Sequence, residues 1–224
     1  MCLLAPAALA LAGCGSVNLG RSSLETVRLA VSGRQVEAVP DPAQVAASPY
    51  AQILVRGSEG SALLLLGNVD DGREAYYSGD RAIVYLRAGL LEATSGLAQD
   101  VDQVRIEGEN PFAHLAGVRQ PVETARRYDW RVDGRTPGYR YGVPVRGRLE
   151  RIGPERVQIL GAARDLVHFR ETLHGPGVSG GNDYWADPAT GFIWKSRQLV
   201  APDLFLEITQ LKPYQAPGRA VAAP

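Results

Sequence analysis

The sequence predicts a mainly β protein: an antiparallel meander that forms a sandwich or a half-open barrel, with a short helix near the N-terminus. Two observations support this fold class. From residue 50 onward, short runs rich in β-branched and aromatic residues alternate with turns of Gly, Asp, Asn and Pro. About a dozen such runs fit into the chain, a spacing typical of all-β sandwiches and barrels.

The N-terminal stretch has the character of a secretory signal. Residues 1–13 (MCLLAPAALALAG) carry no charge. They are too few to span a bilayer as a helix, but they match the apolar stretch of a signal peptide. Residues Leu11–Cys14 read LAGC, which resembles the lipobox of bacterial lipoproteins. We therefore expect a lipoprotein signal peptide over 1–13 and a lipidated tether over 14–21.

Lipidation of Cys14 determines the expected cofactor and location. Cys2 would be removed with the signal peptide, so no thiol would remain for a disulfide or a metal site. The covalent lipid on Cys14 is then the only added group that we expect, since several acyl chains together hold a protein firmly on a membrane. Gly15 stands where an Asp would, by resemblance to known sorting rules, signal inner-membrane retention. This predicts an anchor in outer-membrane lipid, on the periplasmic face.

The rest of the chain reads as one domain. We expect a single mainly-β domain over 22–213 and a disordered tail over 214–224, which is rich in Ala, Pro and Gly. Residues 22–33 predict a short helix, because Ser and Glu stand at capping-box spacing before an apolar stripe that ends at a Gly. Residues 40–49 contain three prolines and predict a loop with at most one helical turn.

The strands fall into two series. The predicted strands of the first series cover 50–57, 61–68, 73–78, 81–89 and 90–96. Those of the second cover 128–134, 139–153, 155–161, 164–173, 182–187, 191–200 and 204–211. Residues 98–124 between them contain two prolines and little alternation, so we expect a long crossing segment there.

The stretch GVSGG around Ser179 resembles a hydrolase signature. It fits G-x-S-x-G, and it differs in one residue from the GDSGG of chymotrypsin-like proteases. A nucleophile elbow needs a strand before the serine and a helix after it, and the α/β-hydrolase order needs a later histidine. Here a Gly-rich run leads into another strand pattern, and His114, His168 and His174 all precede the serine. We expect a mobile turn over 175–181 and no catalytic residue.

Other site chemistry finds no support in the sequence. No HExxH pair, paired His spacing or acidic EF-hand loop is present, so we expect no metal site. Basic and acidic residues balance at 24 each, without a basic cluster interleaved with aromatics, which argues against nucleic-acid binding. Glycosidase carboxylates need only meet in space, but no pair stands out.

The aromatic run NDYWADPATGFIWKSRQ predicts a β-hairpin, because Asp187–Gly191 has turn chemistry. Trp185 and Trp194 would lie near opposite positions across it. We favour core packing for them over the alternative, a platform that contacts sugar or lipid. We expect Lys195 and Arg197 to share a strand face with Ile193 and Leu199, exposed at a sheet edge. There they would meet an anionic polymer or deter aggregation. Trp185, Trp194, Lys195 and Arg197 are the candidate glycan or partner surface.

Four stretches together resemble the YjbF/GfcB family of capsule and exopolysaccharide lipoproteins. They are Pro49–Arg56, Gly79–Leu97, Asn182–Gln198 and Glu207–Pro213, behind the lipobox. The resemblance implies an outer-membrane lipoprotein of mostly β structure. It also implies partners in polysaccharide export, namely an outer-membrane β-barrel and periplasmic accessory proteins. It brings no catalytic residue, and only Cys14 transfers as a functional residue.

From these observations we expect a non-enzymatic, lipid-anchored scaffold or accessory binding module that assists export or assembly of capsule or exopolysaccharide. Two alternatives stay open. One is a carrier that holds a lipid or acyl chain in the apolar groove of a half-open barrel. The other is a polysaccharide-modifying enzyme.

Overall fold

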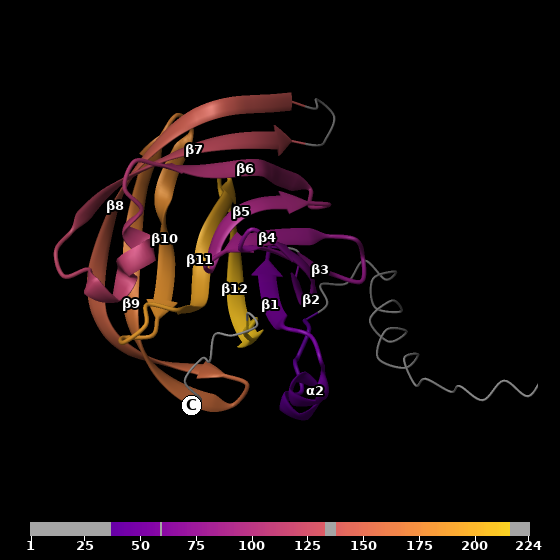
Figure 1. Ribbon diagram of the computed structural model, residues 1–224. Coiled ribbons are helices and arrows are strands. Elements are labelled where there is room, and N and C mark those ends of the chain that lie inside the picture. The colour runs from indigo at the N-terminus through magenta and orange to yellow at the C-terminus, as the bar shows by residue number, and fades with distance from the viewer. Residues whose placement is uncertain (1–36, 59, 133–137, 216–224) are drawn as a thin grey trace, which may run out of the picture.

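The computed structural model describes residues 37–58, 60–132 and 138–215 (Figure 1). They form one sheet of twelve antiparallel strands in the order β5-β4-β3-β2-β1-β12-β11-β10-β9-β8-β7-β6. The strands are β1 (Gln52–Gly57), β2 (Gly60–Asp70), β3 (Arg73–Tyr77), β4 (Ile83–Arg87), β5 (Leu90–Ser95), β6 (Gln99–Glu107), β7 (Val122–Val132), β8 (Gly138–Ile159), β9 (Ala162–Gly175), β10 (Val178–Ala186), β11 (Ile193–Ala201) and β12 (Leu204–Lys212). The helices are α2 (Pro42–Ala47) and the 3-10 helix η1 (Pro111–Gly117).

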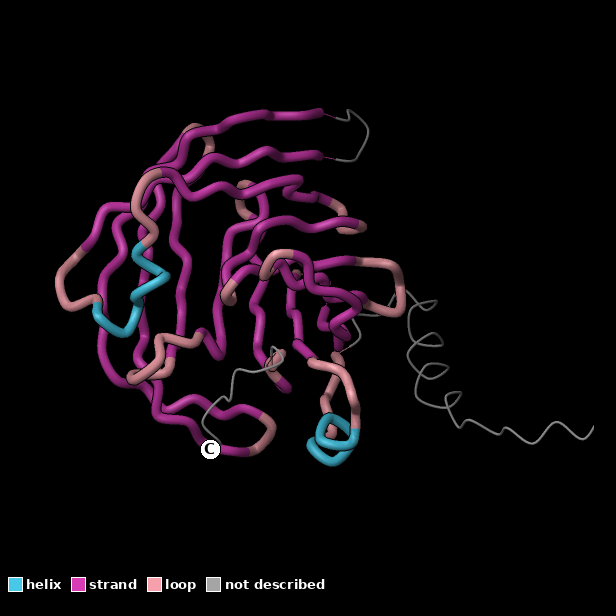
Figure 2. The backbone as a smooth tube through the Cα atoms, viewed as in Figure 1, coloured by secondary structure: helices cyan, strands magenta, loops and turns pink. Residues whose placement is uncertain are grey.

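The sheet is a meander that curls into a nearly closed barrel (Figures 1 and 2). Most strands pair with their neighbours in sequence, and the pairing of β1 with β12 joins the two halves of the meander. The edge strands β5 and β6 are joined by side-chain hydrogen bonds and not by a ladder of backbone hydrogen bonds. The Thr94 hydroxyl donates to Asp100 over 2.8 Å and accepts from the Val101 amide over 3.1 Å. The predicted fold class is therefore confirmed, and of the two predicted forms the sheet takes the barrel, which is closed except for a ladder between β5 and β6.

Tight turns account for the regularity of the meander. The β2–β3, β4–β5 and β8–β9 hairpins each have a two-residue turn in which both residues have positive φ, namely Asp71-Gly72, Ala88-Gly89 and Leu160-Gly161. Turns of this kind match the right-handed twist of the flanking strands. Gly89 is also required by packing, because a Cβ there would lie 2.9 Å from the Cβ of Ile193.

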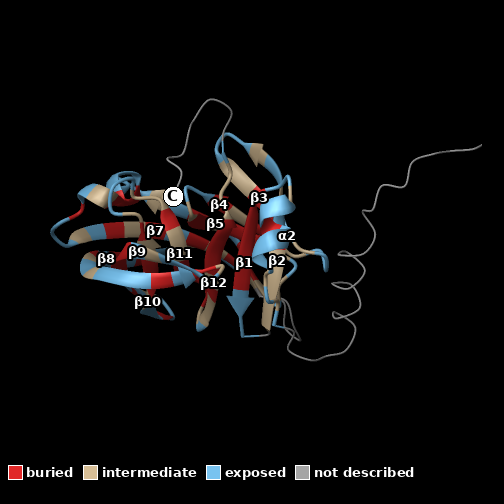
Figure 3. Cartoon of the chain, turned by 90° about the horizontal axis from the view of Figure 1, so that it is seen from below, coloured by how far each residue is buried: buried red, intermediate tan, exposed pale blue. Residues whose placement is uncertain are grey.

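Buried residues form three clusters. The largest lies between the two halves of the sheet and contains Trp130, Tyr76 and Tyr128 among aliphatic side chains. In the second, Phe112 and Leu115 of η1 pack against β8, β9, β10 and β11. The third joins α2 to β1, β12 and the β8–β9 hairpin. Figure 3 shows the buried residues concentrated on the strands, while α2 exposes most of its surface. The barrel interior is thus filled by side chains.

One segment differs from the sequence prediction, and another agrees with it. Strand β6 lies within residues 98–124, where we expected a crossing segment. A bulge between Val101 and Gln103 interrupts its alternation, which hides the strand in the sequence. Helix α2 supplies the helical turn expected within 40–49, since the Asp41 side chain caps it by accepting from the Ala43 amide over 2.9 Å.

Several predictions concern the ends of the chain. The signal peptide, the Cys14 tether and the helix over 22–33 lie outside the described residues, as does most of the tail. Tyr214, which we placed in that tail, instead packs against the largest core cluster. Within the described ranges, neither helix is long and apolar enough to cross a membrane.

Candidate functional site

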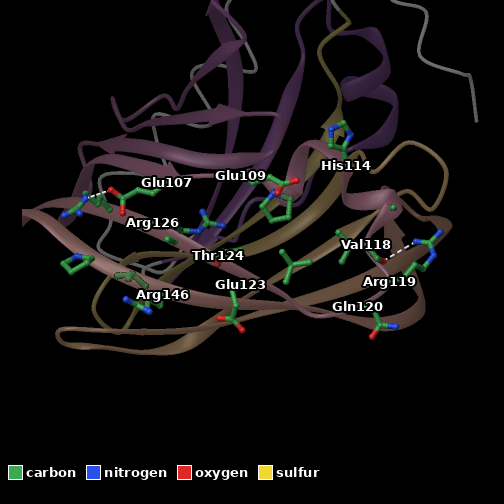
Figure 4. Close-up of a pocket in the computed structure, with 17 residues that line it drawn as sticks. Glu107, Glu109, His114, Val118, Arg119, Gln120, Glu123, Thr124, Arg126 and Arg146 are labelled. Atoms are coloured by element: carbon green, nitrogen blue, oxygen red, sulfur yellow. Dashed lines mark hydrogen bonds and ion pairs between the residues drawn. The ribbon is translucent and has the colours of Figure 1, made fainter.

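An open depression of about 950 Å³ lies between the segment Glu107–Gln120 and strands β7 and β8 (Figure 4). Figure 4 shows Arg126 and Thr124 between Glu107 and Glu109 on one side and Glu123 and Arg146 on the other. The ionisable residues that line it are Glu107, Glu109, His114, Arg119, Glu123, Arg126, Arg127 and Arg146.

Most of these charges are matched within the protein. Glu107 forms an ion pair with Arg127, and Glu123 pairs with Arg148 over 3.2 Å. Arg119 donates to the backbone carbonyl of Ala116 over 2.5 Å. The depression therefore offers a mixed rim of donors and acceptors, without a strong field of either sign.

A buried polar network adjoins the depression. Glu171 on β9 accepts from Arg126 at both carboxylate oxygens, over 3.1 and 2.9 Å. It also accepts from Thr124 over 2.6 Å, and from Asn182 and Tyr184 over 3.0 Å each. The Arg126 and Glu171 side chains are 2% and 0% exposed, so this is an ion pair removed from water.

The network keeps Glu171 and Arg126 ionised. Burial alone would raise the pKa of Glu171, but the charge of Arg126 and the hydrogen bonds from Thr124, Arg126 and Asn182 hold this pKa below its ordinary value. Burial would likewise lower the pKa of Arg126, yet Glu171 raises it. A general acid needs a carboxyl whose pKa is raised towards neutrality, so Glu171 has the opposite of that property.

The close packing of this network also explains a glycine on β8. A Cβ at Gly147 would lie 2.2 Å from the Thr124 hydroxyl and 2.8 Å from a Glu171 oxygen. Only glycine leaves space for both groups at this position.

Ser179 lies on a strand, which corrects one sequence prediction. The turn that we expected over 175–181 is confined to Pro176 and Gly177, and strand β10 begins at Val178 because the β9–β10 ladder continues to the very end of the hairpin. Ser179 is exposed opposite His174, and no hydrogen bond among the described residues joins it to a histidine. It therefore has no hydrogen-bonded base.

The histidines are dispersed over the fold. His114 lies in η1, whereas His168 on β9 contacts Asp183 over 2.8 Å and stacks on Trp185 with ring centroids 4.8 Å apart. In the part of the chain that the structure describes, no group of three His, Cys, Asp or Glu side chains is placed to hold a metal ion.

The predicted aromatic hairpin is confirmed. Strands β10 and β11 pair across the turn, in which the Asp187 carboxylate accepts from the amides of Ala189 and Thr190 over 3.0 and 2.7 Å. The two tryptophans lie near opposite positions, as expected, but they are not direct partners. Trp185 lies opposite Lys195 and not opposite Trp194, because a bulge between Trp185 and Ala186 shifts the pairing.

The same bulge corrects the placement of the two cations. We expected Lys195 and Arg197 on a sheet edge and on the same face as Ile193. However, β11 lies inside the sheet between β10 and β12. Ile193 pairs with Ala186 while Lys195 pairs with Trp185, so the two β11 side chains point to opposite faces.

The structure brings the four candidate surface residues near one another. However, a cation covers the ring of each of the two tryptophans. The Lys195 ammonium lies 5.1 Å from the ring centroid of Trp185, and the Arg164 guanidinium lies 3.6 Å from that of Trp194. Arg197 likewise lies 3.8 Å over the ring of Phe205. These cation–π contacts stabilise the fold and leave little open ring face for a sugar.

Two side chains of the stretch Asn182–Gln198 join strands to one another. The Asn182 side-chain oxygen accepts from the Leu199 amide over 2.8 Å. Gln198 on β11 accepts from the Leu91 amide and donates to the Gly89 carbonyl, over 2.9 Å each. Gln198 thereby links the middle of the sheet to its edge strand β5, a role that sequence spacing could not reveal.

Comparison with known proteins now decides the family. A family model described as "Group 4 capsule polysaccharide lipoprotein gfcB, YjbF" matches residues 24–211, which is most of the chain. The chain belongs to the YjbF family. The resemblance noted from the sequence is thus confirmed, and it associates this YjbF protein with membrane-anchored lipoproteins and with capsule polysaccharide.

Two relatives from Escherichia coli K12 agree with this assignment. The uncharacterized lipoprotein GfcB is 26% identical over 210 residues, which cover 92% of this chain and 95% of GfcB. The crystal structure of the hypothetical lipoprotein YmcC superimposes with a TM-score of 0.70 at 24% identity, over 88% of this chain and 98% of YmcC. The second likeness shows that the YjbF fold is shared.

Proposed function

We propose that this YjbF protein is an outer-membrane-anchored periplasmic lipoprotein that assists export or assembly of capsule or exopolysaccharide as a non-catalytic scaffold or accessory binding module. One observation supports this above all. The three buried carboxylates of the described residues, Asp100, Glu171 and Asp183, are each paired with an arginine. Because these buried carboxylates form ion pairs and side chains fill the barrel, we expect the domain to act through its surface and not as a catalyst.

The mechanism that we propose is local concentration. Acyl chains on Cys14 would confine the domain to the periplasmic side of outer-membrane lipid. Contacts with a membrane-embedded β-barrel, a periplasmic accessory protein or a passing polysaccharide would then form at high effective concentration, so weak affinity suffices.

The two alternatives receive less support from the packing. A lipid carrier needs an apolar chamber, whereas the barrel interior holds Trp130, Tyr76 and Tyr128. The depression beside β7 is open and has charged residues on its rim. A polysaccharide-modifying enzyme would need an acid and a base with suitable pKa values, and Glu171 is held ionised.

The test is purification of the full acylated chain from native membranes in mild detergent, followed by mass spectrometry of the associated proteins and lipids. We expect an outer-membrane β-barrel protein to co-purify, and no lipid in excess of what a membrane-anchored control lipoprotein carries. A stoichiometric extra lipid without a protein partner would favour the carrier. Recovery of the chain with neither would contradict the scaffold.

A further inference from the structure

Tyr139 and Tyr141 differ from the covered aromatic residues on the protein surface. The two residues are 55% and 69% exposed, and neither ring has a cation among its described contacts. Tyr85, Trp185 and Trp194, by contrast, each have a cation over the ring. The two tyrosines therefore present open aromatic surface to solvent.

The pair is ordered on strand β8. Tyr139 and Tyr141 stand two residues apart, so their side chains share one face of the strand. Their rings are parallel within 1°, with centroids 5.6 Å apart. Arg140 between them points to the other face, where its guanidinium lies 5.6 Å from the ring centroid of the fully buried Trp130. The platform is thus backed by the barrel core.

Polar side chains on β6 and β7 continue this face. Arg131 lies opposite Tyr139 on β7 and pairs with Asp100 over 2.7 Å. Asp129 accepts from the Gly142 amide over 2.6 Å and pairs with Arg105 over 3.2 Å. The Arg105 and Arg131 side chains are 45% and 30% exposed, and each is paired with a carboxylate that is itself mostly or wholly buried, so the strip presents charge-paired guanidinium groups to the surface.

We propose that Tyr139 and Tyr141, with the charge-paired guanidinium groups of Arg131 and Arg105 beside them, form a binding platform for uncharged pyranose rings of a glycan chain. Aromatic rings offer large, rigid contact area to the C–H faces of a sugar, and the phenol groups add hydrogen bonds to its hydroxyls. The balanced charge selects against a polyanion, which would need a cationic surface. This inference rests on the proposed function, since it assigns that function's glycan contact to the start of β8 and not to the Trp185 hairpin.

The experiment measures binding of the full acylated chain, in detergent, to purified capsular polysaccharide of the producing strain and to dextran as a neutral probe, with heparin as the polyanionic probe. We expect the wild-type chain to bind capsular polysaccharide, dextran or both. The double variant Tyr139→Ala, Tyr141→Ala should bind at least one of these two probes at least tenfold more weakly. The double Phe variant should keep most of the affinity, and the Tyr50→Ala control, which removes an equally exposed ring, should leave it unchanged. Affinity should change little when salt is raised, because paired charges contribute little long-range attraction.

Three outcomes overturn the platform. They are unchanged binding in the double Ala variant, no binding of either non-heparin probe by the wild-type chain, or preferential, salt-sensitive binding of heparin. Thermal unfolding separates lost binding from lost folding, since removal of two exposed rings should leave the unfolding temperature near that of the wild type.

Its failure can be told apart from failure of the proposed function. If deletion of the chain reduces capsule while the tyrosines prove dispensable for binding, the platform fails and the export role stands. If the tyrosines are required for binding but deletion leaves capsule unchanged, the platform stands and the export role fails.

Discussion

Replacement of Glu171 by glutamine is expected to lower the free energy of unfolding by roughly 3–5 kcal/mol, because it leaves the buried Arg126 charge without its counter-ion. Glutamine fills nearly the same space, so packing changes little and the loss reports on charge. The side chains of both partners are almost wholly buried, which removes the solvent screening that weakens surface pairs. Urea unfolding followed by circular dichroism measures the difference.

The matched control is Asp165→Asn, which breaks the exposed ion pair with Arg156 on the neighbouring strand. We expect no measurable change in stability from that variant. Equal behaviour of the two variants would show that the Arg126–Glu171 pair contributes no more than a surface pair, contrary to our account of the network.

The same pair predicts a direction for the pH dependence. The pKa of Glu171 is held below its ordinary value of 4.5 in the folded protein. Its contribution is therefore fully present above the unfolded carboxyl pKa and is lost as pH falls below about 4.5 towards the folded value. The stabilities of wild type and Glu171→Gln should converge in that acid window. A gap between them that stays constant down to the acid limit would contradict the assigned shift.

Replacement of Cys14 by alanine is expected to move the protein from the membrane fraction to the soluble periplasmic fraction. Each buried methylene of an acyl chain contributes about 0.8 kcal/mol to membrane binding, and two or more chains together anchor firmly. Without the thiol no chain can be attached. Fractionation of host cells followed by immunoblotting measures the distribution, and mass spectrometry of the wild-type N-terminal peptide identifies the modification.

The fold should survive this change, because the described domain begins well after Cys14. The released variant should unfold at the temperature of a wild-type sample in detergent. Persistence of the alanine variant in carbonate-washed membranes would show that something other than acyl chains holds the protein there.

The features that depend on neighbouring residues, namely the turns and most of the strands, could be predicted from the sequence. The Asp187–Gly191 turn specified the β10–β11 hairpin, and alternation specified most strands. The β-bulges could not be predicted. One extra residue in a strand moves all later side chains of that strand to the opposite face of the sheet. For that reason strand β6 was missed, and the direct partner of Trp185, which is Lys195 next to Trp194, was not identified.

The buried network could be anticipated only in part. Glu171 stands between Phe169 and Leu173 at inward-facing positions, and a charge there signals a buried partner. Its identity depends on register, because Arg126 is 45 residues away along the chain and two strands away in the sheet. The Tyr139–Tyr141 pair escaped for a related reason: exposure distinguishes those rings from the others, and exposure requires the fold.

The chemistry of the capsular polysaccharide tests the central claim most directly. Polysaccharide from cells with and without this protein can be compared by amount at the cell surface and by the sugar composition, linkages and substituents of its repeat unit. A non-catalytic export module predicts less polymer at the surface with an unaltered repeat unit. A changed linkage, substituent or chain cleavage pattern, with the surface amount unchanged, would contradict it.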